Sequence, residues 1–90
     1  MKIQFFANIR DITKTKEAEV AAPKDILKLL YLVSEKYGKE MAAKLIGADG
    51  KLHPDMIVLL NGRHIEYVNG EESALTDADT VSFFPRIAGG

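Results

Sequence analysis

The sequence predicts an α+β domain in which one mixed β-sheet packs on one main helix. Segments rich in β-branched and aromatic residues lie near both ends of the chain and in its second half, and they have the length of strands. A stretch with apolar residues at helical spacing lies between the second and the third of them. The chain has 90 residues, 47% of them hydrophobic, which is enough for one compact domain. We expect a domain over residues 1–86 and a flexible tail over residues 87–90.

The first two strands are expected to form a hairpin. Residues 2–8 alternate in character, so that Phe6 lies on the face opposite to Phe5 and Ala7. Residues 15–21 alternate less cleanly between charged neighbours and fit a half-exposed second strand. The first strand therefore has one buried face and one outward face.

The main helix is predicted to follow Pro23. Asp25 can cap its free amide groups, and Gly38 is a favourable stop because glycine adopts the left-handed conformation at little cost. A second short helix over residues 39–46 and a turn-rich stretch over residues 47–54 come next. The apolar stripe of the main helix consists of Ile26, Leu27, Leu29, Leu30, Val33 and Tyr37.

Three further strands are expected in the second half of the chain. Residues 56–60 are apolar on both faces, which leaves the outer face of this strand for a partner to cover. Asn61-Gly62 supplies the positive φ values of a tight turn into a short strand over residues 63–67. Residues 80–84 form the last strand, and Pro85 ends it because proline cannot donate a ladder hydrogen bond. The first and last strands are expected to lie side by side and parallel.

Charge and composition narrow the classes of partner. The formal net charge is −1 with acids and bases interspersed, so neither a nucleic acid nor an anionic membrane is expected to bind. The longest apolar run is too short to span a bilayer and no signal peptide is evident, which predicts a cytoplasmic protein. The chain has no cysteine, and this excludes disulfides, thiolate metal sites and a persulfide on its own side chains.

The usual catalytic and metal-binding constellations are not found in the sequence. His53 and His64 belong to different elements without a second ligand at suitable spacing, so we expect two surface histidines and no metal. Asp77 and Asp79 could form a carboxylate pair, but Asp-x-Asp between strand signals is more typical of a turn. Residues 47–51 carry glycines and a lysine without the Gly-Lys-Ser/Thr ending of a phosphate loop, and fit a solvent loop.

The C-terminus is the most unusual segment. After Pro85 the side chains shrink through Ile87 and Ala88 to Gly89-Gly90. A terminal carboxylate that must pass through a narrow channel to the nucleotide of another enzyme needs residues without Cβ, and two glycines also let it visit more than one active site. A frayed terminus without function is the alternative, and spacing alone leaves both open.

The C-terminal segment resembles that of the MoaD family, the small subunits of molybdopterin synthase. That family ends in Leu-x-Asp-Gly-Asp-x-Val-x-Phe-Phe-Pro-Pro-Val-x-Gly-Gly. Residues 75–90 closely resemble this pattern, although Ala78 replaces a glycine and Arg86 replaces the second proline. The segment Lys2–Ala7 and the Asn61-Gly62 turn are also similar, and the strand order agrees along essentially the whole chain. The resemblance implies a ubiquitin-like β-grasp fold.

The resemblance also implies a mechanism at Gly90. An adenylating enzyme of the ubiquitin-activating type (MoeB-like) would use ATP to adenylate the Gly90 carboxylate. A sulfur donor such as a cysteine desulfurase or a rhodanese would then convert it into a thiocarboxylate. The tail, including Ala88 and Gly89, would enter a MoaE-like large subunit, whose own residues transfer the sulfur to the pterin precursor. This chain would then bind no cofactor and would be non-catalytic alone.

Alternation along the strands predicts a partner surface. If Val81 and Phe83 face the helix, Phe84 faces outward at the root of the tail, and the outer faces of the neighbouring strands add to the same side. Aromatic anchors in such patches dominate binding energy, whereas partial burial in the core is the alternative. The expected partner-binding residues are Phe84, Phe6, Leu59, Ile87 and Arg86.

Sulfur carriage for molybdenum or tungsten cofactor assembly is the leading functional hypothesis. A ubiquitin-like modifier would use the same activated Gly90 to form isopeptide bonds with lysines. A thiamin-type (ThiS-like) carrier and an adaptor with an inert tail are two further hypotheses. The Phe-Phe-Pro element and the additional segment over residues 39–55 favour the MoaD-like hypothesis over the thiamin-type one.

Overall fold

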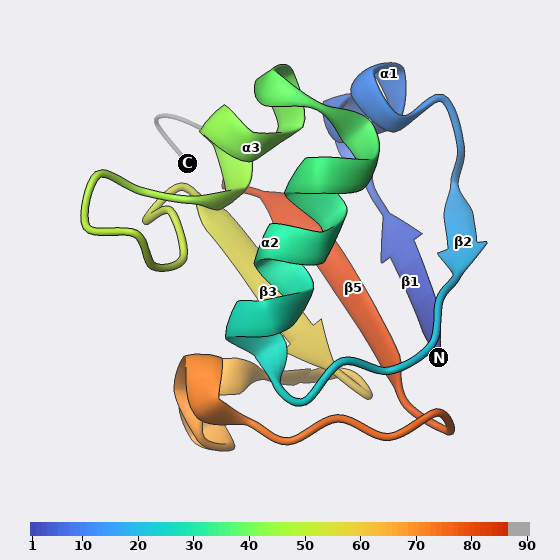
Figure 1. The fold of residues 1–90 in the computed structure, drawn as a ribbon, viewed down its shortest axis with the longest axis vertical. Helices are drawn as coiled ribbons and strands as arrows, with labels where there is room; N and C mark the ends of the chain where they lie inside the picture. The colour runs from blue at the N-terminus through green and yellow to red at the C-terminus, as the bar shows by residue number, and fades with distance from the viewer. Residues whose placement is uncertain (87–90) are drawn as a thin grey trace.

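The computed structural model describes residues 1–86, which form one mixed five-stranded sheet in the order β2-β1-β5-β3-β4. Helices α2 and α3 cover one face of it (Figure 1). The elements are β1 (Lys2–Phe5), the 3-10 helix η1 (Ala7–Ile9), α1 (Arg10–Thr13), β2 (Glu17–Glu19), α2 (Ile26–Tyr37), α3 (Lys39–Leu45), β3 (Met56–Leu60), β4 (Arg63–His64), the 3-10 helices η2 (Ile65–Tyr67) and η3 (Gly70–Glu72), and β5 (Thr80–Pro85). The predicted α+β class is confirmed. Within residues 1–86, no helix combines the length and the apolar character that crossing a membrane requires.

The central pair of the sheet joins the two ends of the chain. Strands β1 and β5 run parallel, with Ile3 opposite Val81 and Phe5 opposite Phe83. Strand β2 pairs antiparallel with the other edge of β1, and β3 pairs antiparallel with the other edge of β5. The predicted parallel contact between the first and last strands is confirmed. Both strands therefore finish at the same end of the sheet.

Helix α2 supplies most of the helical side of the core. Asp25 caps it by accepting a hydrogen bond from the Lys28 amide at 2.9 Å. Gly38 follows the helix with φ of 94°, a conformation that favours glycine. The ring of Phe5 lies 5.9 Å from that of Phe83 and 5.3 Å from that of Tyr37, which joins sheet and helix. The fully buried residues of the core include Ile3, Phe5, Ile9, Ile26, Leu29, Leu30, Val33, Met41, Leu45, Val58, Val81 and Phe83.

The first strand is shorter than predicted. It ends at Phe5, and Ala7 takes φ of 58° at the start of η1, so that Ala7 is exposed and not on the inner face. The two helical turns η1 and α1 bring Ile9 into the core, where it is fully buried. An isoleucine buries far more apolar area than the single methyl of Ala7, which accounts for the turn. The predicted hairpin is therefore an antiparallel pair joined by helical turns.

Two other strands are also shorter than predicted. Strand β2 covers Glu17–Glu19 instead of residues 15–21, because the hydroxyl of Thr15 donates to the Glu17 carbonyl at 2.8 Å and holds a local turn. Strand β4 has two residues, and the chain continues as η2 with Ile65 buried. Burial of this one side chain draws the chain off the edge of the sheet.

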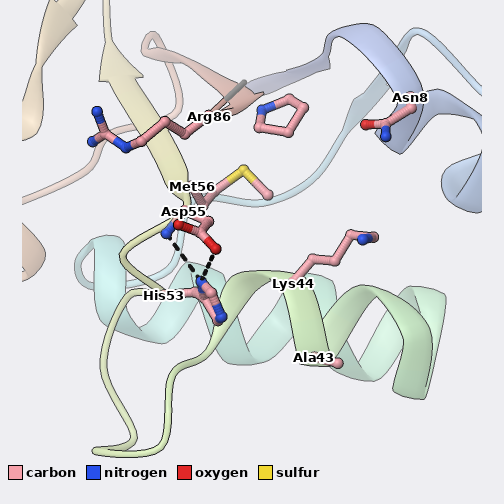
Figure 2. A pocket seen from close by; sticks show the side chains of 8 residues that line it. Asn8, Ala43, Lys44, His53, Asp55, Met56 and Arg86 are labelled. Atoms are coloured by element: carbon pink, nitrogen blue, oxygen red, sulfur yellow. Dashed lines mark hydrogen bonds and ion pairs between the residues drawn. The ribbon is translucent and has the colours of Figure 1, made fainter. Parts of the chain in front are cut away.

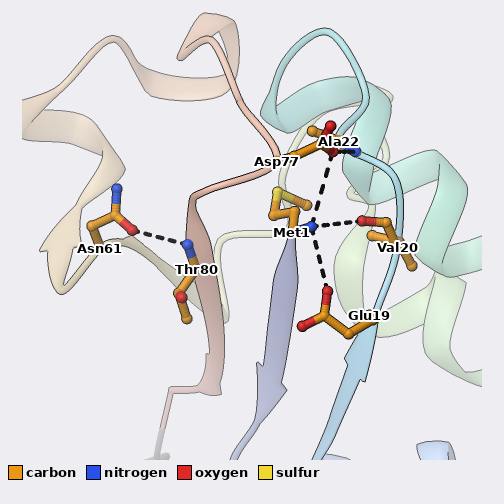
Figure 3. A network of polar contacts seen from close by, with 7 residues as sticks. All are labelled: Met1, Glu19, Val20, Ala22, Asn61, Asp77 and Thr80. Carbon is orange, nitrogen blue, oxygen red and sulfur yellow. Dashed lines mark hydrogen bonds and ion pairs between the residues drawn. The ribbon is translucent and has the colours of Figure 1, made fainter.

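Asp77 and Asp79 stabilise the connection before β5, as predicted for turn residues. Asp77 Oδ1 accepts a hydrogen bond from the Ala22 amide at 2.8 Å and lies 4.0 Å from the Met1 ammonium (Figure 3). Asp79 accepts from Asn61 Nδ2 at 2.9 Å and from the Thr76 amide at 2.8 Å. These hydrogen bonds, the one from Asn61 first, lower the pKa of Asp79 below its ordinary value.

Asp79→Asn is expected to destabilise the protein near neutral pH. The hydrogen bonds favour the charged carboxylate, so their contribution is fully present above the ordinary aspartate pKa and is lost as the pH falls through the lowered one. Urea unfolding of both proteins between about pH 7 and pH 2 should show a difference in unfolding free energy that closes in the acidic range. Glu35→Gln, at an exposed position in α2, is the control. A difference that does not change with pH would contradict the assignment.

Candidate functional site

The face of the sheet opposite to α2 and α3 carries the candidate site. Strand β3 alternates between buried Met56, Val58 and Leu60 and half-buried Ile57 and Leu59. The second set points away from the helices because successive side chains of a strand lie on opposite faces. The predicted outward orientation of Leu59 is thereby confirmed.

A stacked aromatic pair marks the end of this face at which β1 and β5 finish. The rings of Phe6 and Phe84 are nearly parallel, with centroids 4.2 Å apart and an interplanar angle of 8°. The Phe6 amide donates to the Phe83 carbonyl at 3.1 Å, which keeps the chain beside β5 past the end of β1. Each ring shields the other, so Phe84 is half-buried on the outward face that alternation predicts for it.

The register across the sheet defines two rows of outward side chains, of which the first is apolar and the second is mixed. Ile57 lies opposite Phe84, and together with Phe6 these side chains form the row nearest to the end of β5. The next row contains Leu59 opposite Ser82, whose hydroxyl donates to Gln4 Oε1 at 3.2 Å. We call the four apolar residues of this face the outer-face patch: Phe6, Ile57, Leu59 and Phe84.

Ile57 did not figure among the predicted partner-binding residues. Alternation in β3 places it on the same face as Leu59, so the sequence contained this signal. Its position opposite Phe84 depends on the β3–β5 register, which the sequence does not state. Ile57 is therefore closer to the end of β5 than the predicted Leu59.

Arg86 is exposed and is tied to the loop before β3. Its amide donates to the Asp55 carbonyl at 2.6 Å, and its Nε donates to the Pro54 carbonyl at 3.2 Å. Figure 2 shows the side chain extending away from the neighbouring hollow, with its guanidinium group at the far end. These two hydrogen bonds fix Arg86, the last residue that the structure describes, to the loop before β3.

The hollow beside Arg86 has a volume of about 280 Å³. Figure 2 shows that its lining side chains come from η1, α3, the loop before β3, β3 itself and the end of β5. His53 Nδ1 is occupied, since it accepts the Asp55 amide hydrogen at 3.0 Å. The lining also contains the Lys44 ammonium, the Asn8 amide and the Asp55 carboxylate, whose Oδ2 lies 4.0 Å from His53 Nδ1 and thus beyond hydrogen-bond distance.

Both histidines cap turns. His64 Nδ1 accepts from the Glu66 amide at 3.2 Å, as His53 Nδ1 does from the amide of Asp55. Both side chains are half-buried, so each keeps part of its surface in contact with solvent. Over residues 1–86 the structure contains no group of three or more histidine, aspartate or glutamate side chains that could hold a metal ion.

The predicted tail residues lie outside the described part of the chain. These are Ile87, Ala88, Gly89 and Gly90, and their roles remain predictions. Arg86, the last described residue, follows directly after β5 and lies at the same end of the sheet as the Phe6–Phe84 stack. Any group attached beyond Arg86 therefore begins next to the apolar row.

A family model and three curated relatives match the chain. The model of the ThiS family matches residues 3–90. Small archaeal modifier protein 3 of Haloferax volcanii is 35% identical over 100% of this chain and 98% of its own length. A putative sulfur carrier protein of Archaeoglobus fulgidus is 35% identical over 82% of this chain and 84% of its own length. The molybdopterin synthase sulfur carrier subunit of Escherichia coli is 32% identical over 100% of this chain and 99% of its own length.

Solved structures of related proteins have the same fold. The HVO 2177 protein of Haloferax volcanii superimposes with a TM-score of 0.82 and 34% identity, over 99% of this chain and 84% of that one. Small archaeal modifier protein 1 of Methanosarcina acetivorans gives a TM-score of 0.83 with 26% identity, over 99% and 94%. The predicted ubiquitin-like β-grasp fold is confirmed.

The stack between Phe6 and Phe84 should be measurable as a coupling energy. Phe6→Ala and Phe84→Ala are each expected to lower the unfolding free energy by about 1–2 kcal/mol, and a double-mutant cycle should give a coupling of about 1 kcal/mol. Phe83→Ala is the control, because this fully buried ring should cost about 3–5 kcal/mol. If Phe84→Ala costs as much as Phe83→Ala, the outer-face patch belongs to the core. Absence of coupling would show that the two rings do not stack in solution.

Proposed function

The chain belongs to the ThiS family of ubiquitin-like sulfur carriers, and from this premise we propose that it carries sulfur as a thiocarboxylate on Gly90. In the first step a Gly90 carboxylate oxygen attacks the α-phosphate of ATP and pyrophosphate leaves. The persulfide of a sulfur donor then attacks the acyl carbon and AMP leaves. A second thiol finally attacks the donor sulfur of the acyl disulfide, so that the S–S bond to the acyl group breaks, a disulfide forms between that thiol and the donor, and Gly90 keeps sulfur in place of one oxygen.

The observation that carries this proposal is the place of the outer-face patch. Its aromatic pair lies at the end of the sheet where β5 finishes and the sequence continues to the Gly-Gly tail. Within residues 1–86 no helix covers this face, and flat aromatic side chains are the usual anchors of protein interfaces. A partner that binds the patch thereby holds the root of the tail and directs Gly90 into its own active site.

Catalysis is assigned to the partners in this proposal. The hollow at the root of the tail is lined by Lys44, Asn8 and the His53–Asp55 pair. His53 Nδ1 accepts the Asp55 amide hydrogen and lies 4.0 Å from the Asp55 carboxylate, so the pair lacks the hydrogen bond that would make it an acid–base couple. An adenylating enzyme of the ubiquitin-activating type would bind the ATP and activate Gly90. A cysteine desulfurase or a rhodanese would supply the sulfur. This chain then acts as a carrier that presents an acyl group and binds no cofactor.

Molybdopterin synthesis is the first candidate for the destination of the sulfur. The Escherichia coli relative of 32% identity, which is named as the sulfur carrier subunit of molybdopterin synthase, supports it, as does the Phe83-Phe84-Pro85 element. The acceptor complex would then contain a MoaE-like large subunit bound to the outer-face patch. Its active site would receive the tail and transfer the sulfur to the pterin precursor.

Protein modification is the second candidate. The Haloferax volcanii relative of 35% identity is named a small archaeal modifier protein and spans this chain completely. A lysine amine in place of the persulfide would attack the same Gly90 acyl adenylate and form an isopeptide bond as AMP leaves. Both candidates use the same activated tail, so they differ only in the second nucleophile.

A thiocarboxylate at Gly90 is the expected product when the chain is co-expressed with its cognate adenylating enzyme and sulfur donor. Intact-mass spectrometry should show a form heavier by the difference between sulfur and oxygen. Oxidation of any of the 3 methionines adds nearly the same mass, so alkylation and fragmentation must place the change at Gly90. Gly90 joined to lysines of other proteins, without any thiocarboxylate, would contradict sulfur carriage and support modification.

Deletion of Gly90 is expected to abolish activation without affecting folding. The core cluster of the described residues extends only to Phe83, so the unfolding free energy should change by less than about 0.5 kcal/mol. ATP–pyrophosphate exchange by the adenylating enzyme should fall to background, because the acyl group that accepts AMP is misplaced. Unchanged exchange would rule out Gly90 as the activated residue, and a large loss of stability would assign the tail a structural role.

A further inference from the structure

Arg10 lies beside the aromatic stack in a fixed orientation. Its Nε donates to the Phe5 carbonyl at 2.9 Å, and its guanidinium carbon lies 5.7 Å from the centroid of the Phe6 ring. The hydrogen bond and the cation–π contact together restrict the side chain. The hydrogen bond uses Nε alone, so the two terminal NH₂ groups are left to bind a further acceptor. No sequence pattern singles out Arg10, because its position relative to Phe6 depends on the unpredicted turns η1 and α1.

Arg86 lies on the other side of the stack, and its Nε is also bound to a backbone carbonyl. Strand order places β5 between β1 and β3, and Arg86 Nε donates to Pro54, just before β3. Arg10 belongs to the β1 side, since it is bound to Phe5 and Phe6. Each guanidinium is thus tied through Nε to a backbone carbonyl, and the two arginines flank the Phe6–Phe84 pair.

Charge around the stack is not balanced by ion pairs. Among residues 1–86 neither Arg10 nor Arg86 forms a salt bridge, although both are exposed. Asp77 and Asp79 precede the start of β5 and therefore lie at the opposite end of the sheet. Two guanidinium groups without an ion-pair partner among the described residues therefore lie at the end of β5.

We infer that Arg10 and Arg86 form a clamp for carboxylate side chains that flank the entrance of the adenylating partner's tail-binding channel. Arginine presents parallel N–H donors that match a carboxylate, and a guanidinium already held through Nε loses little further entropy on binding. The adenylating enzyme is the occupant because activation of Gly90 precedes both sulfur transfer and lysine modification. The inference rests on the proposed function and adds the chemical class of the surface that recognises this chain.

Binding to the purified cognate adenylating enzyme tests the clamp. The dissociation constant is measured for the wild type, Arg10→Gln, Arg10→Lys, Arg86→Gln and Arg63→Gln, at about 0.05 M and 0.5 M salt. Each Arg→Gln change at the clamp is expected to raise the constant about ten-fold at low salt and to reduce its salt dependence. Arg63→Gln is the matched control, because Arg63 is exposed in β4, away from the stack, and donates to the Tyr67 carbonyl at 3.2 Å.

Arg10→Lys separates the contribution of the positive charge from that of the planar guanidinium group with its parallel N–H donors. It keeps the charge without the parallel donors, so its dissociation constant should fall between those of the wild type and Arg10→Gln. Thermal unfolding of each variant verifies that the fold is retained. The clamp is overturned if either Arg→Gln variant at Arg10 or Arg86 binds within about two-fold of the wild type at low salt, or if its loss of affinity is the same at both salt concentrations.

Phe84→Ala distinguishes failure of the clamp from failure of the proposed function. If Phe84→Ala weakens binding while the arginine variants do not, the outer-face patch is the docking surface and only the clamp is wrong. If the wild type itself shows neither binding nor ATP–pyrophosphate exchange, the proposed function fails and the clamp fails with it. Weakened binding in Phe84→Ala and in both arginine variants supports the two together.

Discussion

The parallel pairing of β1 with β5 is the constraint on which the rest of the structure depends. Its register places Phe5 opposite Phe83, and alternation then puts Phe6 and Phe84 on the other face. One register therefore creates both the core contact at 5.9 Å and the outer stack at 4.2 Å. A shift by one residue would exchange the two faces and expose the core. Stability and the candidate docking surface are thus consequences of a single strand pairing.

The two faces of the sheet have different roles because the helices cover only one of them (Figure 1). On the covered face, Val58, Val81 and Phe83 are completely buried and stabilise the domain. On the other face, the outer-face patch keeps part of its apolar area in contact with solvent, and stacking of Phe6 on Phe84 limits that area. The remaining exposed area is what a partner can remove from water, so binding energy is available at the root of the tail.

The proposed function assigns recognition and an acyl group to this chain, and the chemistry to its partners. It has no cysteine, and the histidines among its described residues cap turns. Arginines held by hydrogen bonds and a stacked aromatic pair lose little entropy on docking, which favours binding of the partners proposed for this chain. Under the proposed function, the two candidate acceptors require different nucleophiles from the next partner and no change in this chain.

The sequence by itself determined the elements whose signals are local. The cap at Asp25, the stop at Gly38, the alternation of residues 56–60 and the Asn61-Gly62 turn depend on neighbouring residues, and all four were predicted. The outward direction of Phe6, Phe84 and Leu59 followed from the same alternation. The tapering tail was also visible in the sequence, and resemblance to a known family added the mechanism expected at Gly90; residues 87–90 lie beyond the described structure.

Only the tertiary structure decided where β1 and β4 end, because burial of Ile9 and Ile65 by distant elements outweighs the local preference for a strand. It also decided which outward residues meet. Ile57 reaches Phe84 through the register of β3 on β5, and Arg10 reaches Phe6 through two helical turns. Contacts between segments far apart in the chain follow from packing, which no local pattern specifies.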